Sequence, residues 1–432
     1  MLKISKNYPK CTGMAIHCTL ERLPAKLRLR VLNDQIRTNS GFDHSIYENM
    51  RVVVIGCGAA GASAAVFLKR AGHEVEIFEQ APECRAVGAG FLMQPTGMEV
   101  LHELGIHDKI ISHCSKISRL HVIEKDGRDL MELRYAELGE NLFGAGLHRP
   151  VVMNALIELV VNEGIEIHWG SRVEHVQKNS DHWQIGNKKF DLLVIADGAR
   201  SAMRQNLLGK GFDRGYGWGA HWFIGKNNRV FPSNDLHQIV NGTRELAGFL
   251  PTGYEIGSTE ELLSLFWSVR IEDDNAIRRQ PLKVWKDKIL ALCPMSENLL
   301  DQINDWEQVF TARYGDVSMR KWHGDRFVFL GDAGHAMSPQ LGQGVNLALA
   351  DASCLATCIA EFPLEKALTE YSRRRGPTLR YYQLATRSLT PIFQSDHEWI
   401  TPFRHSAFRI SQRIPPIRKM MTKSMAGMMR GI

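Results

Sequence analysis

The chain has 432 residues, of which 44% are hydrophobic and 23% are charged, and its formal net charge is +6. This length allows two associated domains, and the composition is typical of a globular protein. The positive charge lies at the ends: residues 1–49 carry eight basic side chains against four acids, and the segment after Thr401 carries seven and no acid. Because the part between them is slightly acidic, the net charge gives no reason to expect nucleic-acid binding.

The eight cysteines contain no CxxC pair, and no histidine or cysteine cluster has the spacing of a zinc site, so we expect no metal. Cys354 and Cys358 lie one helical turn apart in an apolar stretch, which indicates a buried helix. Reduced thiols and a cytoplasmic location fit this cysteine pattern best. No run of about 18 consecutive apolar residues occurs, so we expect no transmembrane helix.

The first 49 residues are basic and lack the apolar core of a secretory signal. Met50 stands directly before a predicted strand, where a nucleotide-binding unit commonly starts. We therefore expect residues 1–49 to be an extension outside the fold. A targeting role for the amphiphilic stretch Leu20–Ile36 is the alternative.

The run Arg51–Ile55 predicts a strand buried on both faces, and a helical pattern follows from Ala62 to Ala71. Between them stand three glycines with separate roles. Gly56 allows a tight turn, Gly58 lets the backbone approach a pyrophosphate, and Gly61 lets helix and strand pack closely. The start of the helix then offers free N–H groups to the phosphate.

A second strand is predicted from Glu74 to Glu79, whose closing carboxylate lies 18 residues beyond Gly61. An acid at this place binds both hydroxyls of an adenosine ribose, which favours FAD or NAD over NADP. Strand, three glycines, helix and terminal acid together predict a dinucleotide site.

Two later strands also end in acids. The run that begins at Asp191 ends in Asp197-Gly198, and the apolar run from Arg326 delivers Gly331-Asp332 to its carboxyl end, where open α/β sheets bind ligands. A helical pattern from Val345 to Ala360 follows Gly342 and Gly344, whose backbone can lie against a flat ring.

These three segments, in this order, closely resemble the group A FAD-dependent monooxygenases of the p-hydroxybenzoate hydroxylase type, over about residues 50–363. Ile195 departs from the family, which often has glycine there. Arg85, before Val87-Gly-Ala-Gly90, stands where relatives have an arginine over FAD, and His148-Arg149 with Leu156 is similar to a further family motif. The resemblance implies these cofactor-binding residues: Gly56, Gly58, Ala60, Gly61, Glu79, Gln80, Arg85, Arg149, Asp197, Gly198, Asp332, Pro339, Gly342, Gly344, Val345 and Asn346.

The expected fold class is α/β, with a Rossmann-type FAD-binding domain built from residues 50–120, 145–215 and 312–365. A β-rich substrate domain is expected from residues 121–144 and 216–311, and a helical region from 366 to 432. Within them, Asp126-Gly127 predicts a hairpin between His121–Lys125 and Leu130–Arg134, and Glu365–Ser388 predicts a helix.

As the resemblance implies, NADH or NADPH reduces FAD, and the reduced flavin captures O₂ as a C4a-hydroperoxide that hydroxylates an aromatic or otherwise electron-rich substrate. No catalytic side chain is assigned, and His335 is expected to hydrogen-bond locally. Two alternatives stay open: a reductase of unsaturated or prenyl lipids, and a flavin-binding protein without turnover. The WxWxIP motif of flavin halogenases is absent.

Two further features allow two interpretations each. Tyr216, Trp218, His221, Trp222 and Phe266-Trp267 either pack an antiparallel sheet or line a substrate cavity. The segment from Arg404 to Arg430 predicts a basic amphipathic helix, which either packs on the core or contacts an anionic membrane surface.

Overall fold

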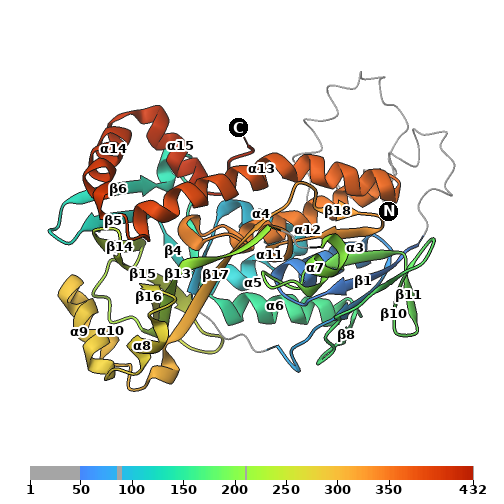
Figure 1. The fold of residues 1–432 in the computed structure, drawn as a ribbon, viewed down its shortest axis with the longest axis horizontal. Coiled ribbons are helices and arrows are strands. Elements are labelled where there is room, and N and C mark those ends of the chain that lie inside the picture. The colour runs from blue at the N-terminus through green and yellow to red at the C-terminus, as the bar shows by residue number, and fades with distance from the viewer. Residues whose placement is uncertain (1–48, 85–89, 210–211, 432) are drawn as a thin grey trace, which may run out of the picture. The chain divides into compact units, whose positions relative to one another are not determined.

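The computed structural model describes residues 49–84, 90–209 and 212–431. Residues 1–48 and Arg85 lie outside the described residues. A central sheet has six strands in the order β18-β19-β12-β1-β2-β8 (Figure 1). All pairs in it are parallel except β18 with β19. The strands are β1 (Arg51–Ile55), β2 (Glu74–Phe78), β8 (Glu166–His168), β12 (Leu192–Ile195), β18 (His323–Gly324) and β19 (Phe327–Phe329).

Both faces of this sheet are covered, which is why the β1 sequence is a continuous apolar run. Val52 and Val54 pack against helices, whereas Val53 and Ile55 pack against a small sheet in the order β11-β10-β9. The helices on the first face are α3 (Ala59–Arg70), α4 (Pro95–Leu104), α5 (His107–Ile111), α6 (Arg149–Asn162) and α12 (Gly344–Glu361). The opposite face carries β9 (Gln177–Lys178), β10 (Trp183–Ile185), β11 (Lys188–Phe190) and α7 (Ala202–Leu208).

A second large sheet has seven strands in the order β17-β13-β16-β15-β14-β5-β6, antiparallel except for β14 with β5. Its strands are β5 (Arg119–Glu124), β6 (Asp129–Arg134), β13 (Phe212–Lys226), β14 (Asp235–Asn241), β15 (Glu245–Tyr254), β16 (Glu261–Arg270) and β17 (Phe310–Ser318). The β5–β6 pair confirms the predicted hairpin. One face packs on α8 (Asp274–Arg278), α9 (Leu282–Leu292), η3 (Pro294–Ser296), α10 (Glu297–Leu300) and η4 (Trp306–Gln308).

A three-stranded sheet joins the two large sheets. It consists of β3 (Gly90–Met93), β7 (Gly144–His148) and β4 (Ser115–Ile117), in the order β3-β7-β4. A Cβ on Gly146 would lie 1.9 Å from the Pro251 carbonyl oxygen, and one on Gly90 would lie 1.9 Å from Thr252 Cγ2. Glycine at these positions therefore lets β15 lie directly on the small sheet.

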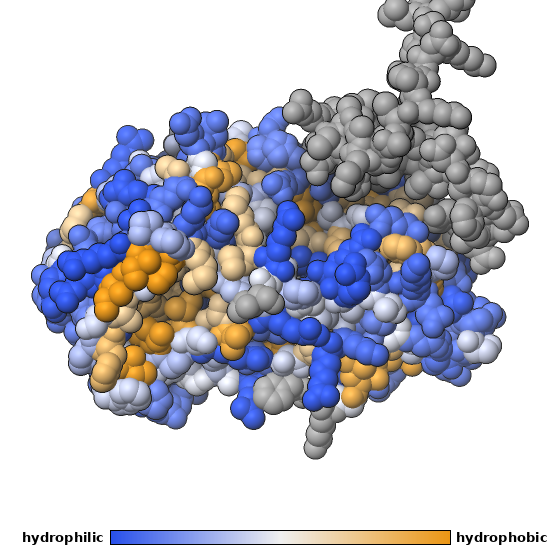
Figure 2. Space-filling model, turned by 90° about the horizontal axis from the view of Figure 1, so that it is seen from above, coloured by the Kyte–Doolittle hydropathy of each residue, from blue (hydrophilic) through white to orange (hydrophobic). Residues whose placement is uncertain are grey.

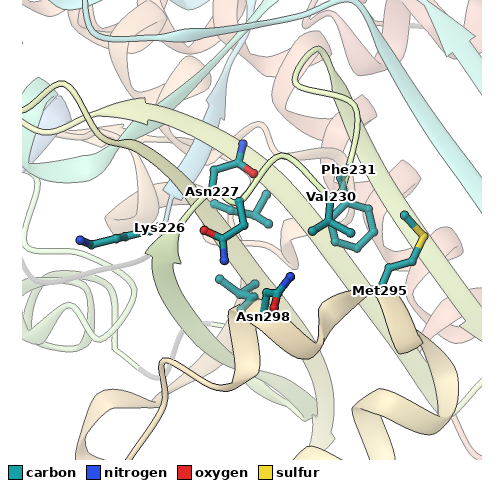
Figure 3. A pocket seen from close by; sticks show the side chains of 9 residues that line it. Lys226, Asn227, Val230, Phe231, Met295 and Asn298 are labelled. Atoms are coloured by element: carbon teal, nitrogen blue, oxygen red, sulfur yellow. The ribbon is translucent and has the colours of Figure 1, made fainter.

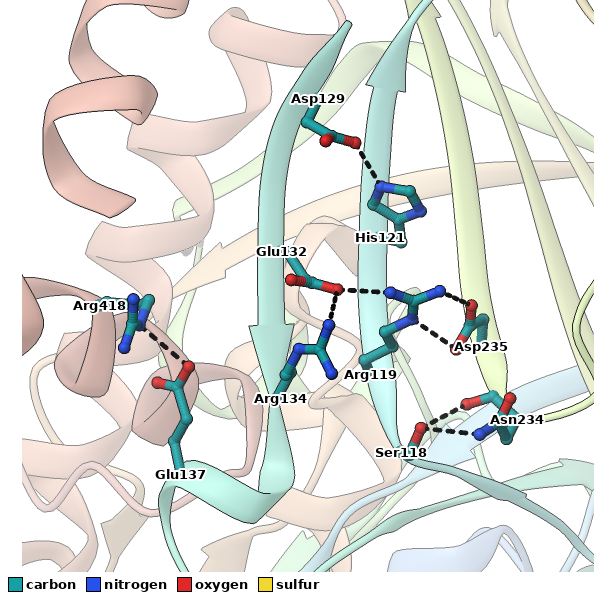
Figure 4. A network of polar contacts seen from close by, with 10 residues as sticks. All are labelled: Ser118, Arg119, His121, Asp129, Glu132, Arg134, Glu137, Asn234, Asp235 and Arg418. Atoms are coloured by element: carbon teal, nitrogen blue, oxygen red, sulfur yellow. Dashed lines mark hydrogen bonds and ion pairs between the residues drawn. The ribbon is translucent and has the colours of Figure 1, made fainter. Parts of the chain in front are cut away.

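The last helices are α13 (Leu364–Phe393), α14 (Thr401–Arg413) and α15 (Pro415–Met425) (Figure 1). Helix α14 contacts η6 (Glu398–Ile400), and α15 contacts η2 (Tyr135–Glu137). The single helix expected over 404–430 is wrong, because Pro415 and Pro416 lack N–H donors and start a new helix. Arg418 of α15 pairs with Glu137 at 2.9 Å, beside the hairpin (Figure 4). One face of the basic segment thus packs on the core, with Arg404, Phe408 and Met425 buried, whereas Phe403 and Ile410 stay exposed.

Among the described residues, α12 alone has the length and composition to cross a bilayer, and half of its 18-residue window is buried. It packs between α3 and α13 and contains both Cys354 and the fully buried Cys358. Residues 49–432 form one compact unit. The division into an FAD-binding and a substrate domain therefore stays a prediction.

Candidate flavin site

Four of the predicted segments meet at one edge of the six-stranded sheet. Gly56 follows β1, Glu79 follows β2, Asp197 follows β12 by one residue, and Asp332 lies beyond β19. Because β19, β12, β1 and β2 are neighbours in that order and all parallel, their carboxyl ends lie side by side. This edge is where open α/β sheets bind their ligands.

The first loop has the geometry that a pyrophosphate site needs. Gly56 has φ +99°, and a Cβ there would lie 2.4 Å from the Ala196 carbonyl oxygen. A Cβ on Gly61 would lie 1.9 Å from the Gly56 carbonyl oxygen, so only glycine lets α3 start this close to β1. No atom lies within 4 Å of a Cβ placed on Gly58. The space beside Gly58 is therefore open, as a phosphate approaching the helix N-terminus requires.

Glu79 lies beside this loop, and its carboxylate accepts hydrogen bonds from the N–H groups of Cys57 (2.7 Å) and Ala81 (2.8 Å). A carboxylate accepts about four such bonds, so capacity is left for ribose hydroxyls. Burial, followed by the charge of Glu79, raises the pKa of the Cys84 thiol, and the charge of Arg149 opposes that rise. Arg149 thus lies near this end of the site, at the start of α6. Gln80, which follows Glu79 in the chain, is exposed.

A buried arginine joins the Asp197-Gly198 segment to the Gly331-Asp332 segment. Arg204, which is 1% exposed, donates to the carbonyl oxygens of Ala333 and Ala199 at 2.8 Å each. Gly198 has φ +81° and no atom within 4 Å of a placed Cβ. Burial raises the pKa of Asp197 above its usual value. Gly198 therefore stands in an open turn beside the partly buried Asp197, and Arg204 fixes this turn to the neighbouring loop.

The Gly331-Asp332 segment contacts the start of α3, directly after the glycine loop that follows β1. A Cβ on Gly331, which has φ +56°, would lie 3.1 Å from Ala60 Cβ, so Ala60 and Gly331 are in contact across the sheet edge. Asp332 begins the short helix α11 (Asp332–His335), and its carboxylate is exposed. One of its oxygens lies 3.8 Å from a Cβ placed on Gly344. The acid of the third segment thus stands between the first loop and the start of α12.

A buried ion-pair cluster holds this turn in place. Asp351 of α12 accepts hydrogen bonds from the Gly331 N–H (2.9 Å), from His335 Nε2 (2.5 Å) and from Arg375 Nε (2.6 Å). His335 is thus buried against the next helix and not directed into open space. Burial raises the pKa of Asp351, but the charges of His335 and Arg375 outweigh that effect and hold the pKa below its usual value.

The loop from Pro339 to Gly344 contains η5 (Pro339–Leu341). Gly342 caps the end of η5 and has φ +62° and an open Cβ position. Asn346 fixes this loop: its Nδ2 donates to the Gly342 carbonyl oxygen (3.1 Å), and its Oδ1 accepts from the Gln94 N–H (2.8 Å). Val345 packs partly on the core. The side chain of Asn346 therefore binds protein backbone on both sides of the loop.

Two glutamines near this loop were missed by sequence reasoning. Gln94 is fully buried and accepts a hydrogen bond from the Tyr135 hydroxyl (2.6 Å). Gln343 Nε2 donates to the Met425 carbonyl oxygen (2.6 Å), which ties the loop to the end of α15. Neither glutamine belongs to a recognisable pattern, so no sequence signal could have identified them.

The seven-stranded sheet faces this loop with one of its surfaces. Gln394 links the two, because its amide donates to the Gly219 carbonyl oxygen (3.1 Å) and accepts from Gln340 (2.7 Å). On the same side, Leu250 packs with Leu92 of β3. Tyr216 lies beside Ser338 and Thr390, and burial raises the pKa of its hydroxyl.

The aromatic residues of β13 and β16 divide between the two surfaces of the sheet. His221 and Trp267 face α8–α10 and are buried, so for them sheet packing is the correct interpretation. Trp222 and Phe266 face the other way as a register pair, with an edge-to-face contact at 5.1 Å, and Phe266 also packs partly on the core cluster that contains Phe393. Their cross-strand row continues through Gly248 to Gln238.

Two hollows elsewhere do not suit a flavin. A pocket of about 10 Å³ between Asn227 and Asn298 has room for at most one water (Figure 3). An open hollow of about 350 Å³ beside Arg244 and Glu398 is lined by polar side chains. Neither contains a residue of the four converging segments.

The comparisons with known proteins agree with this geometry. Residues 49–381 match the family described as FAD binding domain. The chain is similar to the FAD-dependent urate hydroxylase of Klebsiella oxytoca, with 28% identity over 362 residues, 78% of this chain and 89% of that one. It is also similar to the probable 2-heptyl-3-hydroxy-4(1H)-quinolone synthase of Rhodococcus erythropolis, with 28% identity over 344 residues, 77% and 85% of the two chains.

The fold agrees with the crystal structure of Klebsiella pneumoniae HpxO complexed with FAD and uric acid, with a TM-score of 0.74 at 22% identity. That match covers 89% of this chain and 99% of the other. The alternatives of a prenyl-lipid reductase and of a flavin protein without turnover find no support among the relatives. The chain belongs to the FAD binding domain family and is an FAD-dependent monooxygenase of the p-hydroxybenzoate hydroxylase type.

Proposed function

We propose that this monooxygenase hydroxylates an uncharged, lipophilic aromatic ring. The row Trp222, Phe266, Gly248 and Gln238 on the inward surface of the seven-stranded sheet supports this most directly. Two aromatic faces and a glycine accommodate a flat apolar ring, and one amide can orient it. No cationic side chain belongs to this row, so nothing in it would pair with a substrate carboxylate.

We propose that the four converging segments hold FAD from end to end. The N–H groups at the start of α3, beside Gly58, would bind the pyrophosphate, and Glu79 would bind the adenosine ribose. Asp332 would accept hydrogen bonds from the ribityl chain, and the backbone from Gly342 to Gly344 would lie along the flavin ring. Asn346 would support that backbone and not touch the ring, because its amide is already bonded to Gly342 and Gln94.

Bound FAD supplies the redox and oxygen chemistry, with NADH or NADPH as electron donor and O₂ as oxidant. The protein's own part is to orient and to exclude water. Trp222 and Phe266 would hold the substrate ring against the loop at Pro339, and Gln394, bonded to both sheet and loop, would fix the spacing between them. A dry, fixed geometry of this kind favours transfer of oxygen to the ring over loss to solvent.

The test is a substrate panel scored by NAD(P)H oxidation coupled to hydroxylated product. It pairs neutral rings, such as a 2-alkyl-4-quinolone, with carboxylated ones, such as 4-hydroxybenzoate and 6-hydroxynicotinate. We expect coupled turnover only with neutral members. Preference for the carboxylates would overturn the proposed substrate class.

We also propose a cytoplasmic location with contact to a membrane surface, where a lipophilic substrate would partition. The six described cysteines are free thiols, which suits a reducing compartment.

A further inference from the structure

Helix α14 carries an apolar stripe on the side that faces away from the protein. Phe403 is 68% exposed and Ile410 is 55% exposed, and Ile414 at the end of the helix is 39% exposed. Trp399, just before the helix, is 68% exposed and lies with its ring 6.3 Å from that of Phe403. Steps of four and seven residues place side chains on one helical face, so these four residues form one stripe, called here the α14 stripe.

The helix cannot rotate to bury this stripe, because its opposite face is already fixed. Phe408 is 8% exposed and stacks near Phe393 at 5.7 Å. Arg404 is 2% exposed and donates to Glu124 of the hairpin at 2.7 Å. A helix that is apolar on both faces, with one face in the core, requires a second apolar partner.

The charge around the stripe is positive. From Thr401 to the end, the chain has no acid, and the exposed Arg409, Arg413, Lys419 and Lys423 stand on α14 and α15. The nearby acids lie in ion pairs: Glu124 with Arg404, Glu137 with Arg418, Asp126 with Arg128, and both Asp396 and Glu398 with Arg244. The end of the molecule where α14 and α15 lie in Figure 1 accordingly shows apolar residues between hydrophilic ones when seen from above (Figure 2).

We infer that the α14 stripe docks on an anionic lipid bilayer. A helix lying in the membrane interface needs apolar and aromatic residues on one side and basic residues at its flanks, and this helix has both. Tryptophan beside the stripe suits the headgroup level. A second copy of this chain fits less well, because two positively charged surfaces repel each other. A stripe one helix wide also offers less area than the about 800 Å² that each partner buries in a stable interface.

Docking there would place the membrane beside α15, which contacts α14. The end of α15 is bonded to Gln343 of the loop from Pro339 to Gly344 through the Met425 carbonyl oxygen. A lipophilic substrate could then pass from the bilayer to the site without crossing water. The inference deepens the membrane contact proposed above, but it does not depend on the proposed hydroxylation.

The test uses the full chain and vesicles of phosphatidylcholine with and without about a third phosphatidylserine, without substrate. We expect co-sedimentation with the anionic vesicles only, weakened by salt. The double variant Phe403→Ser, Ile410→Ser should lower vesicle affinity about tenfold or more, and Arg409→Gln with Arg413→Gln should lower it on anionic vesicles alone. Val161→Ser, which changes an equally exposed apolar residue on α6, is the matched control.

Equal recovery of the wild type and the Phe403, Ile410 variant would overturn the inference, as would binding that ignores lipid charge. A concentration-dependent dimer in sedimentation velocity that the same double variant abolishes would assign the stripe to a second copy instead. Because no turnover is measured, a wrong substrate class would leave these results unchanged.

Discussion

Two regions of the molecule are built in different ways: the edge of the six-stranded sheet, where we propose that FAD binds, and the inward surface of the seven-stranded sheet. At the edge, the geometry comes from the backbone: a side chain on Gly56 or Gly61 would collide with a backbone carbonyl oxygen, and Gly331 has φ +56°. On the inward surface, the shape comes from side chains such as Trp222 and Phe266, and a Cβ on Gly248 would make only ordinary contacts at 3.6 Å. The first region tolerates few residue types, whereas the second tolerates many.

This difference explains why the cofactor can be read from the sequence and the substrate cannot. A backbone site leaves glycines at fixed spacing, which is a pattern in the sequence. A side-chain surface leaves only strand residues that equally well pack a core, as His221 and Trp267 do. Substitutions at the sheet edge should therefore change the free energy of unfolding or the Kd for FAD. Substitutions on the inward surface should change only the KM for the substrate.

The largest effect is expected for Asp351→Asn, beneath the edge of the six-stranded sheet. Removing this charge leaves Arg375 and His335 buried without their partner, which costs about 3–5 kcal/mol of the free energy of unfolding. Urea denaturation should measure it. Because the folded-state pKa of Asp351 is depressed, its stabilisation is present above the unfolded pKa near 4 and is lost as the pH falls through the folded value. Asp287→Asn, in an exposed pair with Lys283, should change little.

A pair of glycine substitutions separates folding from cofactor binding within the first loop. Gly61→Ala places a methyl group 1.9 Å from the Gly56 carbonyl oxygen and should lower the free energy of unfolding by about 1–3 kcal/mol. Gly58→Ala meets open space, so the apoprotein should unfold as the wild type does while its Kd for FAD rises about tenfold. Flavin fluorescence titration and urea denaturation of both variants decide. If Gly58→Ala leaves the Kd unchanged, the pyrophosphate does not lie there.

Much of the first loop could be predicted from the sequence, because local pattern and tertiary role coincide. The strand Arg51–Ile55 is confirmed, and α3 begins at Ala59, three residues before the expected Ala62, since small residues in the first turn carry no apolar periodicity. The helix expected over Val345–Ala360 is confirmed within one residue at each end.

The supports of the site could not be predicted. Arg204, Gln94 and Gln343 act through backbone carbonyls or single side chains far away in sequence, and no spacing rule marks such contacts. Asp351 left one signal, an acid inside an apolar helical pattern, which indicates a buried ion pair. The single helix expected after Arg404 is wrong, because the apolar pattern continues across Pro415 and Pro416 although the helix does not.

On the inward surface, Gly248→Leu should fill the space between Phe266 and Gln238. We expect the Kd for FAD and the free energy of unfolding to stay near wild type, because a Cβ at this position makes only ordinary contacts at 3.6 Å. The KM for a neutral aromatic substrate should rise about tenfold or more. A parallel loss of FAD would show that this surface does not stand apart from the cofactor site.

The smallest effect is expected on the outer surface of the same sheet. Burial, then the charge of His121, lowers the pKa of His237 to about 4. Since the unfolded value is near 6.5, the unfolded chain binds the proton first, and stability falls as the pH drops from about 6.5 toward 4. The urea midpoint of His237→Gln should fall less over this window than that of the wild type. His175→Gln, at an exposed histidine, should keep the full slope.

We propose that FAD binds at a sheet edge shaped by the backbone and that the side chains of the inward surface select an uncharged aromatic ring as substrate. The most direct test supplies the FAD-loaded full chain with NAD(P)H and ¹⁸O₂, and offers a 2-alkyl-4-quinolone and 4-hydroxybenzoate in separate reactions. We expect hydroxylated quinolone carrying one ¹⁸O atom, formed in step with NAD(P)H oxidation, and no such product from the carboxylate. Labelled product from 4-hydroxybenzoate and none from the quinolone would contradict this proposal.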